Sequence, residues 1–161
     1  MGFDAHAYAE GRNLVLGGVE IPHPRGLSGH SDADALLHAI GDAILGALGL
    51  EDIGHHFPDD DPAWRDVPSS RILSSIRGMM TEEGYVPVNV DAVIIAQEPK
   101  LAPYIPVMRK TIGRLLGIPE GSVGLKATTT EGLGFTGRGE GLSAAATVLL
   151  TSEGGSRDRP D

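Results

Sequence analysis

In the segment at residues 29–38, a cluster of polar residues runs directly into an amphipathic pattern. The segment is therefore predicted both to begin a helix and to carry a candidate site. Ser31 or Asp32 is a typical N-cap, and Asp34, three residues after Ser31, completes a pattern that resembles a capping box. A helix is therefore predicted from here to about Leu48. Two stripes follow helical spacing. They are an apolar stripe of Leu37, Ile40, Ile44, Ala47 and Leu48, and a polar stripe of Asp34, His38 and Asp42.

The opening segment carries Asp4 and His6, whose side chains leave the same face if the segment is extended. With His38 as a third ligand, this set would suit a divalent transition metal, most simply zinc, and would leave a fourth position open, as catalytic zinc sites do. Asp42, one helical turn after His38, could orient its imidazole. The alternative is that Asp4 and His6 are unrelated surface residues, and their spacing alone favours that alternative.

Length and composition limit the possible classes of protein. The 161 residues predict one domain over residues 1–152, followed by a disordered polar tail over residues 153–161. The absence of cysteine excludes disulfides and thiolate ligands, so a metal must bind to His and carboxylates. A net charge of -9 with 4% aromatic residues argues against nucleic-acid binding. No run approaches the roughly 20 apolar residues of a membrane span, so we expect a cytoplasmic protein without a membrane partner.

The remaining pattern predicts an α+β layered domain. Residues 14–21 indicate a strand with a glycine bend that pairs with the opening segment, and residues 24–29 indicate a flexible loop that brings His30 and Ser31 to a helix N-terminus, where a phosphate could dock. A long loop follows at residues 49–68. We predict a mixed four-stranded sheet with helices on one side. The further helices are expected near residues 69–84 and 104–116, and the further strands at residues 86–96, 123–131 and 142–151.

Two late segments suggest contacts beyond the core. The glycine-rich loop at residues 132–141 contains Arg138 and can bring backbone N–H groups close to phosphates, although it is neither a P-loop nor a dinucleotide fingerprint. The last strand contains three adjacent small residues at 144–146. Small side chains on both faces of a strand favour close packing on its second face, against another subunit.

Four motifs in this order resemble the 2-C-methyl-D-erythritol 2,4-cyclodiphosphate synthase family of non-mevalonate isoprenoid biosynthesis. They lie at residues 2–6, 29–38, 52–59 and 126–138, so the match spans nearly the whole chain. The resemblance implies a homotrimer with active sites between subunits, a bound zinc or similar ion, a Mg²⁺ or Mn²⁺ ion, and a cytidine diphosphate substrate. The family usually has a few more residues before the first motif, which leaves the first strand short here.

The resemblance also implies roles, carried over by position. Zinc would be held by Asp4, His6 and His38, and the second ion by Glu131. His30 and Thr129 would steady the transition state. Asp52 and Gly54 would take the ribose, and Ala96, Lys100 and Leu101 would line the cytosine pocket. The full set expected to bind substrate is Ser31, Asp52, Ile53, Gly54, Asp59, Ala96, Lys100, Leu101, Thr128, Phe135 and Arg138.

The implied reaction is intramolecular. The 2-phosphate of 4-diphosphocytidyl-2-C-methyl-D-erythritol 2-phosphate attacks the β-phosphorus, which closes a cyclic diphosphate and expels CMP. The attacking oxygen is already anionic, so the chemistry needs charge neutralisation and alignment and no protein nucleophile. One alternative is a metal-dependent phosphohydrolase, which the lack of an obvious base disfavours. Another is a non-enzymatic trimer that binds isoprenoid diphosphates, which would leave Asp4 and His30 without a role.

Overall fold

The structure, a computed structural model, describes residues 1–58, 60–64 and 67–153. Apart from Glu153, the tail predicted to be disordered lies outside these residues. No helix in the described part is long and apolar enough to cross a membrane. The strands are β1 (Gly2–Glu10), β2 (Leu14–Leu16), β3 (Val19–Ile21), β4 (Arg25–Leu27), β5 (Tyr85–Ile95), β6 (Val123–Thr128) and β7 (Gly141–Ser152). The helices are α1 (Ala35–Leu48), α2 (Ile53–His56), α3 (Ser69–Glu82), α4 (Ile105–Leu116) and α5 (Gly134–Gly137), with single 3-10 turns at η1 (Pro62–Trp64), η2 (Ala102–Tyr104) and η3 (Glu120–Ser122).

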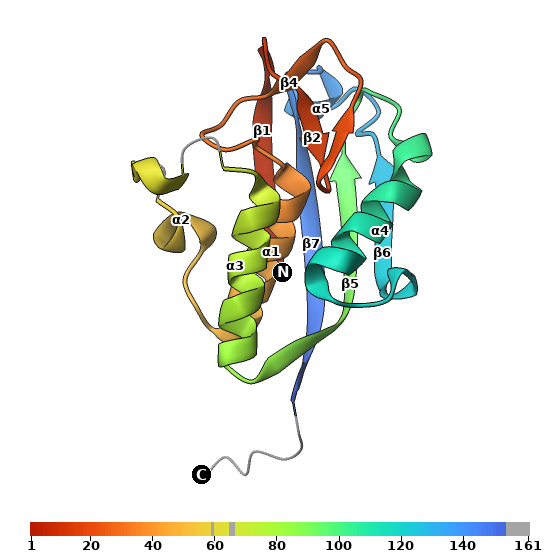
Figure 1. The fold of residues 1–161 in the computed structure, drawn as a ribbon. Helices are drawn as coiled ribbons and strands as arrows, with labels where there is room; N and C mark the ends of the chain where they lie inside the picture. Colours follow the sequence, from red (N-terminus) through yellow and green to blue (C-terminus); the bar gives the residue numbers. More distant parts are fainter. Residues whose placement is uncertain (59, 65–66, 154–161) are drawn as a thin grey trace.

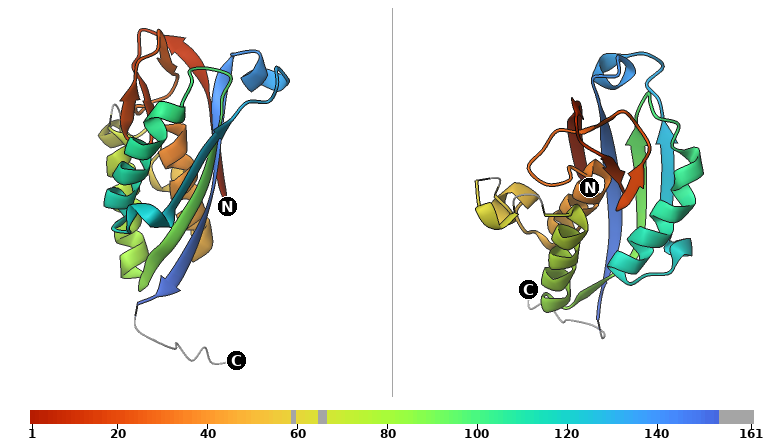
Figure 2. Two further views of the ribbon diagram at one scale, coloured as in Figure 1. Left: turned by 90° about the vertical axis from the view of Figure 1, so that its right-hand side faces the viewer. Right: turned by 45° about the horizontal axis from the view of Figure 1, so that its top comes forward.

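The main sheet is mixed, and α1, α3 and α4 lie on one side of it, as predicted (Figures 1 and 2). Its strand order is β4-β1-β7-β5-β6, in which only β5 and β6 are parallel. Within the described residues the sheet has five strands, so the prediction of four is wrong. The additional strand is β4, which pairs antiparallel with the end of β1 in a segment where the sequence predicts a flexible loop.

Residues 14–21 form a separate hairpin of β2 and β3, so the predicted pairing with the opening segment is wrong. Gly17 and Gly18 connect the two strands with φ of 60° and 70°. Two successive residues of positive φ make the tight turn whose twist suits a hairpin, and glycine adopts this conformation without steric cost. The predicted glycine bend is therefore the turn of a hairpin, at which the chain reverses direction.

Helix α1 begins later than predicted, because its N-cap is Asp34 and not Ser31 or Asp32. Ala33 has a φ of 55°, in the left-handed region, which a right-handed helix cannot contain. The fully buried Asp34 accepts hydrogen bonds from the backbone N of Leu37 at 3.1 Å, of Gly17 at 2.9 Å and of Gly18 at 2.7 Å. Asp34 thus caps α1 and attaches the hairpin to it.

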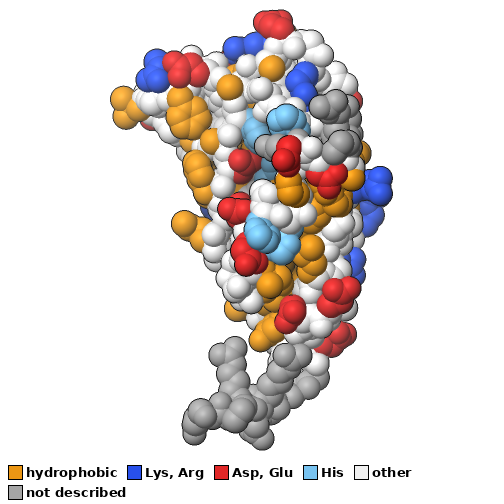
Figure 3. Space-filling model, turned by 90° about the vertical axis from the view of Figure 1, so that its left-hand side faces the viewer, with side chains coloured by type: hydrophobic (Ala, Val, Ile, Leu, Met, Phe, Trp, Pro, Cys, Tyr) orange, Lys and Arg blue, Asp and Glu red, His pale blue; other side chains and the backbone are white. Residues whose placement is uncertain are grey.

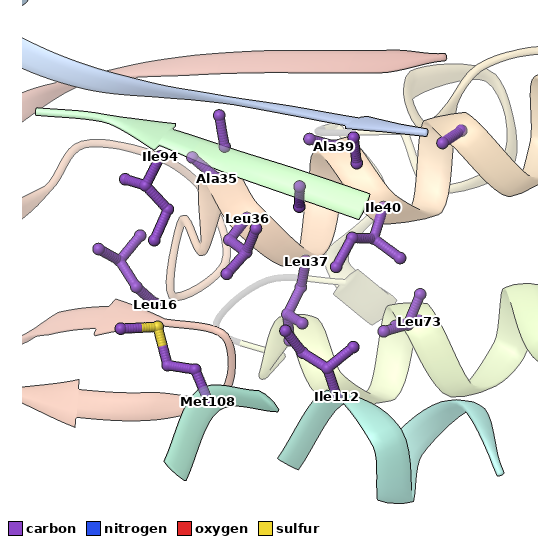
Figure 4. Close-up of a cluster of buried hydrophobic side chains, with 14 of the residues drawn as sticks. Leu16, Ala35, Leu36, Leu37, Ala39, Ile40, Leu73, Ile94, Met108 and Ile112 are labelled. Carbon is purple, nitrogen blue, oxygen red and sulfur yellow. The ribbon is translucent and has the colours of Figure 1, made fainter. Parts of the chain in front are cut away.

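The hydrophobic core lies between the sheet and the helices, with α1 at its centre (Figure 4). Helix α1 packs on β1 and β7, and α3 packs on α1. The predicted apolar stripe is buried at Leu37, Ile40 and Ile44, whereas Ala47 is exposed near the end of the helix. The first strand approaches α1 closely at Gly2, since a Cβ there would lie 2.0 Å from the carbonyl oxygen of Ala39.

The opposite face of the sheet is uncovered by helices in the described part of the chain (Figure 2). It carries Phe3 on β1 and Leu149 on β7, each 56% exposed. It also carries an ion pair between Asp91 on β5 and Lys126 on β6. Large apolar side chains on a regular sheet face are typical of a surface that a partner covers.

Candidate functional site

The structure brings Asp4, His6 and His38 together at the contact of β1 with the first turn of α1. Asp4 Oδ2 lies 2.8 Å from His6 Nε2 and 3.0 Å from His38 Nδ1, and the two nitrogens are 3.4 Å apart. Ligands about 2.0–2.2 Å from a tetrahedral zinc ion lie roughly 3.3–3.5 Å from one another. The three atoms are therefore close to the spacing of a three-ligand zinc site. Figure 3 shows His and acidic side chains gathered on this side of the molecule.

The outer ring nitrogens hold both imidazoles in a ligating orientation. His6 Nδ1 lies 2.8 Å from the carbonyl oxygen of Ser28, which can only accept, so Nδ1 carries a proton and Nε2 is the nitrogen that faces Asp4. His38 Nε2 lies 2.8 Å from Ser69 Oγ, which leaves Nδ1 facing Asp4. Such partners of the outer nitrogen are the usual support of metal-binding histidines. The residues present thus fit a divalent transition metal.

The electrostatics of this set follow from its packing. Burial alone would raise the pKa of Asp4, but hydrogen bonds with His38 and His6 outweigh burial and hold the pKa well below its ordinary value. Burial alone would lower the pKa of His6, but its hydrogen bond with Asp4 and the charge of Asp4 raise it. Asp4 therefore stays ionised through the neutral range, and a cation must compete with a proton at His6.

Asp42 contacts a different partner from the one predicted. Its Oδ1 accepts a hydrogen bond of 2.9 Å from the backbone N of Ile53, at the start of α2. Asp42 thus holds α2 beside α1, and the imidazole of His38 is supported by Ser69 instead. The prediction failed because residues on the same helical stripe need not contact each other when another segment offers closer partners.

One cavity of about 290 Å³ adjoins the Asp4/His6/His38 set. Asp52 also lines this cavity, and its Oδ1 accepts a hydrogen bond from the backbone N of His55 and so caps α2. The cavity joins residues from the first, second and third sequence motifs. Its lining includes His30, Ser31, Asp52, Ile53 and Gly54, all of which the sequence predicts as site residues.

A second cavity of about 530 Å³ lies where β5 and β6 end and η2 begins. Within it, Thr129 Oγ1 donates a hydrogen bond of 2.7 Å to Glu131 Oε1. The two cavities have no described lining residue in common. The second cavity contains the predicted residues Ala96, Lys100, Leu101, Thr128, Thr129 and Glu131.

Two of the predicted residues that the structure describes are not brought into either cavity. Phe135 lies on α5 and is 41% exposed. Arg138 follows α5 and pairs with Glu140, with Nε 2.7 Å and Nη2 3.1 Å from the carboxylate oxygens. The prediction for Asp59 falls outside the described residues.

Two polar residues at the site were missed or assigned another role by the sequence patterns. The guanidinium of Arg12 donates to the carbonyl oxygen of Gly29 at 2.9 Å and to that of Ser31, one on each side of His30. The sequence places Ser69 only at the start of the helix predicted near residues 69–84, yet Ser69 contacts His38. No local pattern indicates either contact, because the partners are 17 to 31 residues away.

Comparison with known proteins gives consistent matches. The model of the YgbB family matches residues 1–151. A relative from Halalkalibacterium halodurans, named 2-C-methyl-D-erythritol 2,4-cyclodiphosphate synthase, is 58% identical over 149 residues, which cover 92% of this chain and 95% of the relative. The solved structure of an enzyme of that name in a CDP-bound form is 39% identical with a TM-score of 0.86, over 93% and 97% of the two chains. A CDP complex of IspF from Plasmodium falciparum is 35% identical with a TM-score of 0.82, over 95% and 94%.

Proposed function

Because this chain belongs to the YgbB family, we propose that it converts 4-diphosphocytidyl-2-C-methyl-D-erythritol 2-phosphate into 2-C-methyl-D-erythritol 2,4-cyclodiphosphate and CMP. The enzyme is a phosphorus–oxygen lyase of non-mevalonate isoprenoid biosynthesis. The observation that carries this proposal is the first cavity, in which Asp4, His6 and His38 lie beside His30 and residues 52–54.

The reaction places simple demands on the site. An oxygen of the 2-phosphate forms a bond to the β-phosphorus, and the bond from that phosphorus to the oxygen retained by CMP breaks. No water is consumed and no protein nucleophile is needed. The protein must hold two mutually repelling phosphates together and align attack with departure.

Two cation sites would meet these demands. Asp4, His6 and His38 would hold zinc or a similar ion, and Glu131 would help to hold Mg²⁺ or Mn²⁺. Such cations, when bound, supply the positive charge that the phosphates require and act as Lewis acids. Thr129 donates to Oε1 of Glu131, which fixes that carboxylate and leaves Oε2 available to bind the cation.

The protein's own groups would bind and orient the rest of the substrate. His30 is proposed to donate to a phosphate oxygen in the transition state, with Ser31 beside it, and Thr129 to steady the same state by holding Glu131. Asp52 uses Oδ1 to cap α2, so its second oxygen is available to a ribose hydroxyl. The second cavity is proposed to take the cytosine, and the CDP-bound relatives support a nucleotide ligand. Phe135, Arg138 and Asp59 stay proposed substrate contacts.

We further propose a homotrimer in which each active site is shared between neighbours. The two cavities lie at opposite sides of one chain, since α1 and α2 border the first whereas β6 and η2 border the second (Figure 1). The uncovered sheet face, with Phe3 and Leu149 exposed, offers a surface for association. In such a trimer the first cavity of one subunit would face the second cavity of the next.

One experiment separates cyclisation from its alternatives. Purified protein supplied with Zn²⁺ and Mg²⁺ is incubated with the cytidylyl substrate, and the products are followed by phosphorus NMR. We expect CMP and a product that retains both phosphates in a ring. Release of inorganic phosphate or an open diphosphate would support a phosphohydrolase. An unchanged substrate would support the non-enzymatic binding trimer and contradict the proposal.

A further inference from the structure

We infer that Ser69 and Asp32 form a hydrogen-bond chain that positions His38 for metal binding. Ser69, the first residue of α3, is 1% exposed, and its Oγ lies 2.8 Å from His38 Nε2. The same hydroxyl donates to Oδ1 of Asp32. The inference rests on the proposed metal site, but it does not depend on which reaction the site catalyses.

The direction of each hydrogen bond follows from the chemistry of the groups. An ionised carboxylate only accepts, so the single hydroxyl proton of Ser69 goes to Asp32. The oxygen of Ser69 must then accept from His38, which places a proton on Nε2. A cation that binds would therefore displace the proton on Nδ1, the nitrogen that faces Asp4 and His6, while Nε2 keeps its own. The hydrogen bonds of Ser69 and Asp32 thus keep Nε2 occupied by a proton and make Nδ1 the nitrogen that binds a cation.

The surroundings single out Ser69 as the partner of His38. The hydroxyl of Ser31 is farther from His38 Nε2, at 3.5 Å, and it already accepts from the backbone N of Ala33 at 3.0 Å. Asp32 is itself fixed, because its Oδ1 also accepts from the backbone N of Ser69 at 3.1 Å. Its negative charge lies at the N-terminus of α3, where the helix dipole favours it.

This arrangement predicts that Ser69 and Asp32 affect metal affinity. A carboxylate that reaches a ligating imidazole through hydrogen bonds increases the basicity of the ligand and fixes its ring, and loss of such a partner typically weakens metal affinity about 10- to 100-fold. Ser69 and Asp32 are thus positioning residues. They would act on the cation through His38, and neither of them lines the first cavity.

The test compares Ser69→Ala with Ser70→Ala, the same change at the next position of α3, and with Ser69→Thr, which keeps the hydroxyl. Zinc affinity is measured on metal-free protein by competition with a chromophoric chelator, without substrate. The nitrogen shifts of the His38 ring are then measured by NMR on the same samples after saturation with zinc. We expect Ser69→Ala to bind zinc about 10- to 100-fold more weakly and to shift the Nε2 signal of His38, because Nε2 loses its hydrogen-bond acceptor. Ser70→Ala should match the parent protein, and Ser69→Thr should retain most of its affinity.

Unchanged zinc affinity and unchanged ring shifts in Ser69→Ala would overturn the inference. If Ser69→Ala does not fold, as judged by circular dichroism, Asp32→Asn is tested instead. The amide removes the negative charge that accepts the hydrogen bond of Ser69. That variant must then show the weaker zinc binding, and parental affinity would count against the inference. Failure of the parent protein to cyclise the substrate would instead overturn the proposed function and leave these binding results intact.

Discussion

Nδ1 of His38 lies 3.0 Å from Oδ2 of Asp4, although 34 residues separate the two in the chain. The contact depends on how closely β1 approaches α1, and Gly2 permits that approach because it has no Cβ to meet the helix backbone. The strand then places Asp4 and His6 on the side that faces α1. The metal site is thus built at a helix–strand contact whose spacing the core fixes.

Substitution of His38 tests the ligand set. We expect the parent protein to hold one zinc ion per chain and His38→Ala to lose most of it, because two ligands do not complete the site. Zinc content is measured by elemental analysis after gel filtration. His55→Ala is the matched control, since His55 lies on α2 outside the lining of the first cavity. Full zinc content in His38→Ala would show that this ligand assignment is wrong.

Zinc affinity should fall as the pH falls. Asp4 raises the pKa of His6 above its ordinary value, so the imidazole gains its proton at a higher pH than a free histidine, and zinc must displace that proton. We expect affinity to decline from above about pH 6.5, by up to tenfold per pH unit below the pKa of His6. Chelator competition from pH 8.5 to 5.5 measures this decline. A constant affinity over that range would contradict the prediction.

Arg12 should matter for turnover, because it holds the backbone on both sides of His30. We expect Arg12→Ala to lower kcat about 10- to 100-fold, since small misplacements of a reacting group have effects of this size. Arg12→Lys should rescue it poorly, because an ammonium group lacks the planar fork that reaches two carbonyl oxygens. Steady-state CMP release is the measurement. Arg114→Ala, an exposed change on α4, is the control, and zinc content should stay unchanged in all three variants.

Asp34 should be important for stability. Asp34→Ala removes the acceptor of three backbone N–H groups and the N-cap of α1, so we expect the free energy of unfolding to fall by about 2–4 kcal/mol. Urea unfolding followed by circular dichroism gives this value. Asp61→Ala, which removes an exposed acceptor of the Ala63 N–H, should cost less than about 1 kcal/mol. Equal effects of the two changes would argue against a special role of Asp34.

Mixed trimers test whether the active site is shared. A subunit with His38→Ala lacks its own zinc site but keeps the second cavity, whereas a subunit with Glu131→Gln keeps the zinc site and loses a ligand of the other cation. Each variant alone should be nearly inactive. Co-refolding the two should restore part of the CMP release, because a mixed trimer contains one interface at which both contributions are intact. Native mass spectrometry verifies the mixed trimers, and a mixture no more active than its parents would reject the shared site.

Local sequence patterns were sufficient for most helices and strands and for the common face of Asp4 and His6, whereas the roles of most candidate residues came from the family resemblance. The periods of helices and strands are properties of neighbouring residues, so the apolar stripe at Leu37, Ile40 and Ile44 predicted α1, and the alternation of Asp4 and His6 predicted their common face. Residue type then limited the chemistry, because without cysteine a metal site had to use His and carboxylates.

The tertiary structure decided what these patterns do not encode. The start of α1 depends on the left-handed Ala33 and on amides of Gly17 and Gly18 that reach Asp34 from another segment. The fifth strand exists because β1 offers an open edge to β4, and Ser69 supports His38 because α3 packs on α1. Each of these contacts joins segments far apart in the chain. Their formation depends on packing and on satisfying buried polar groups across the whole fold, and no local period records either.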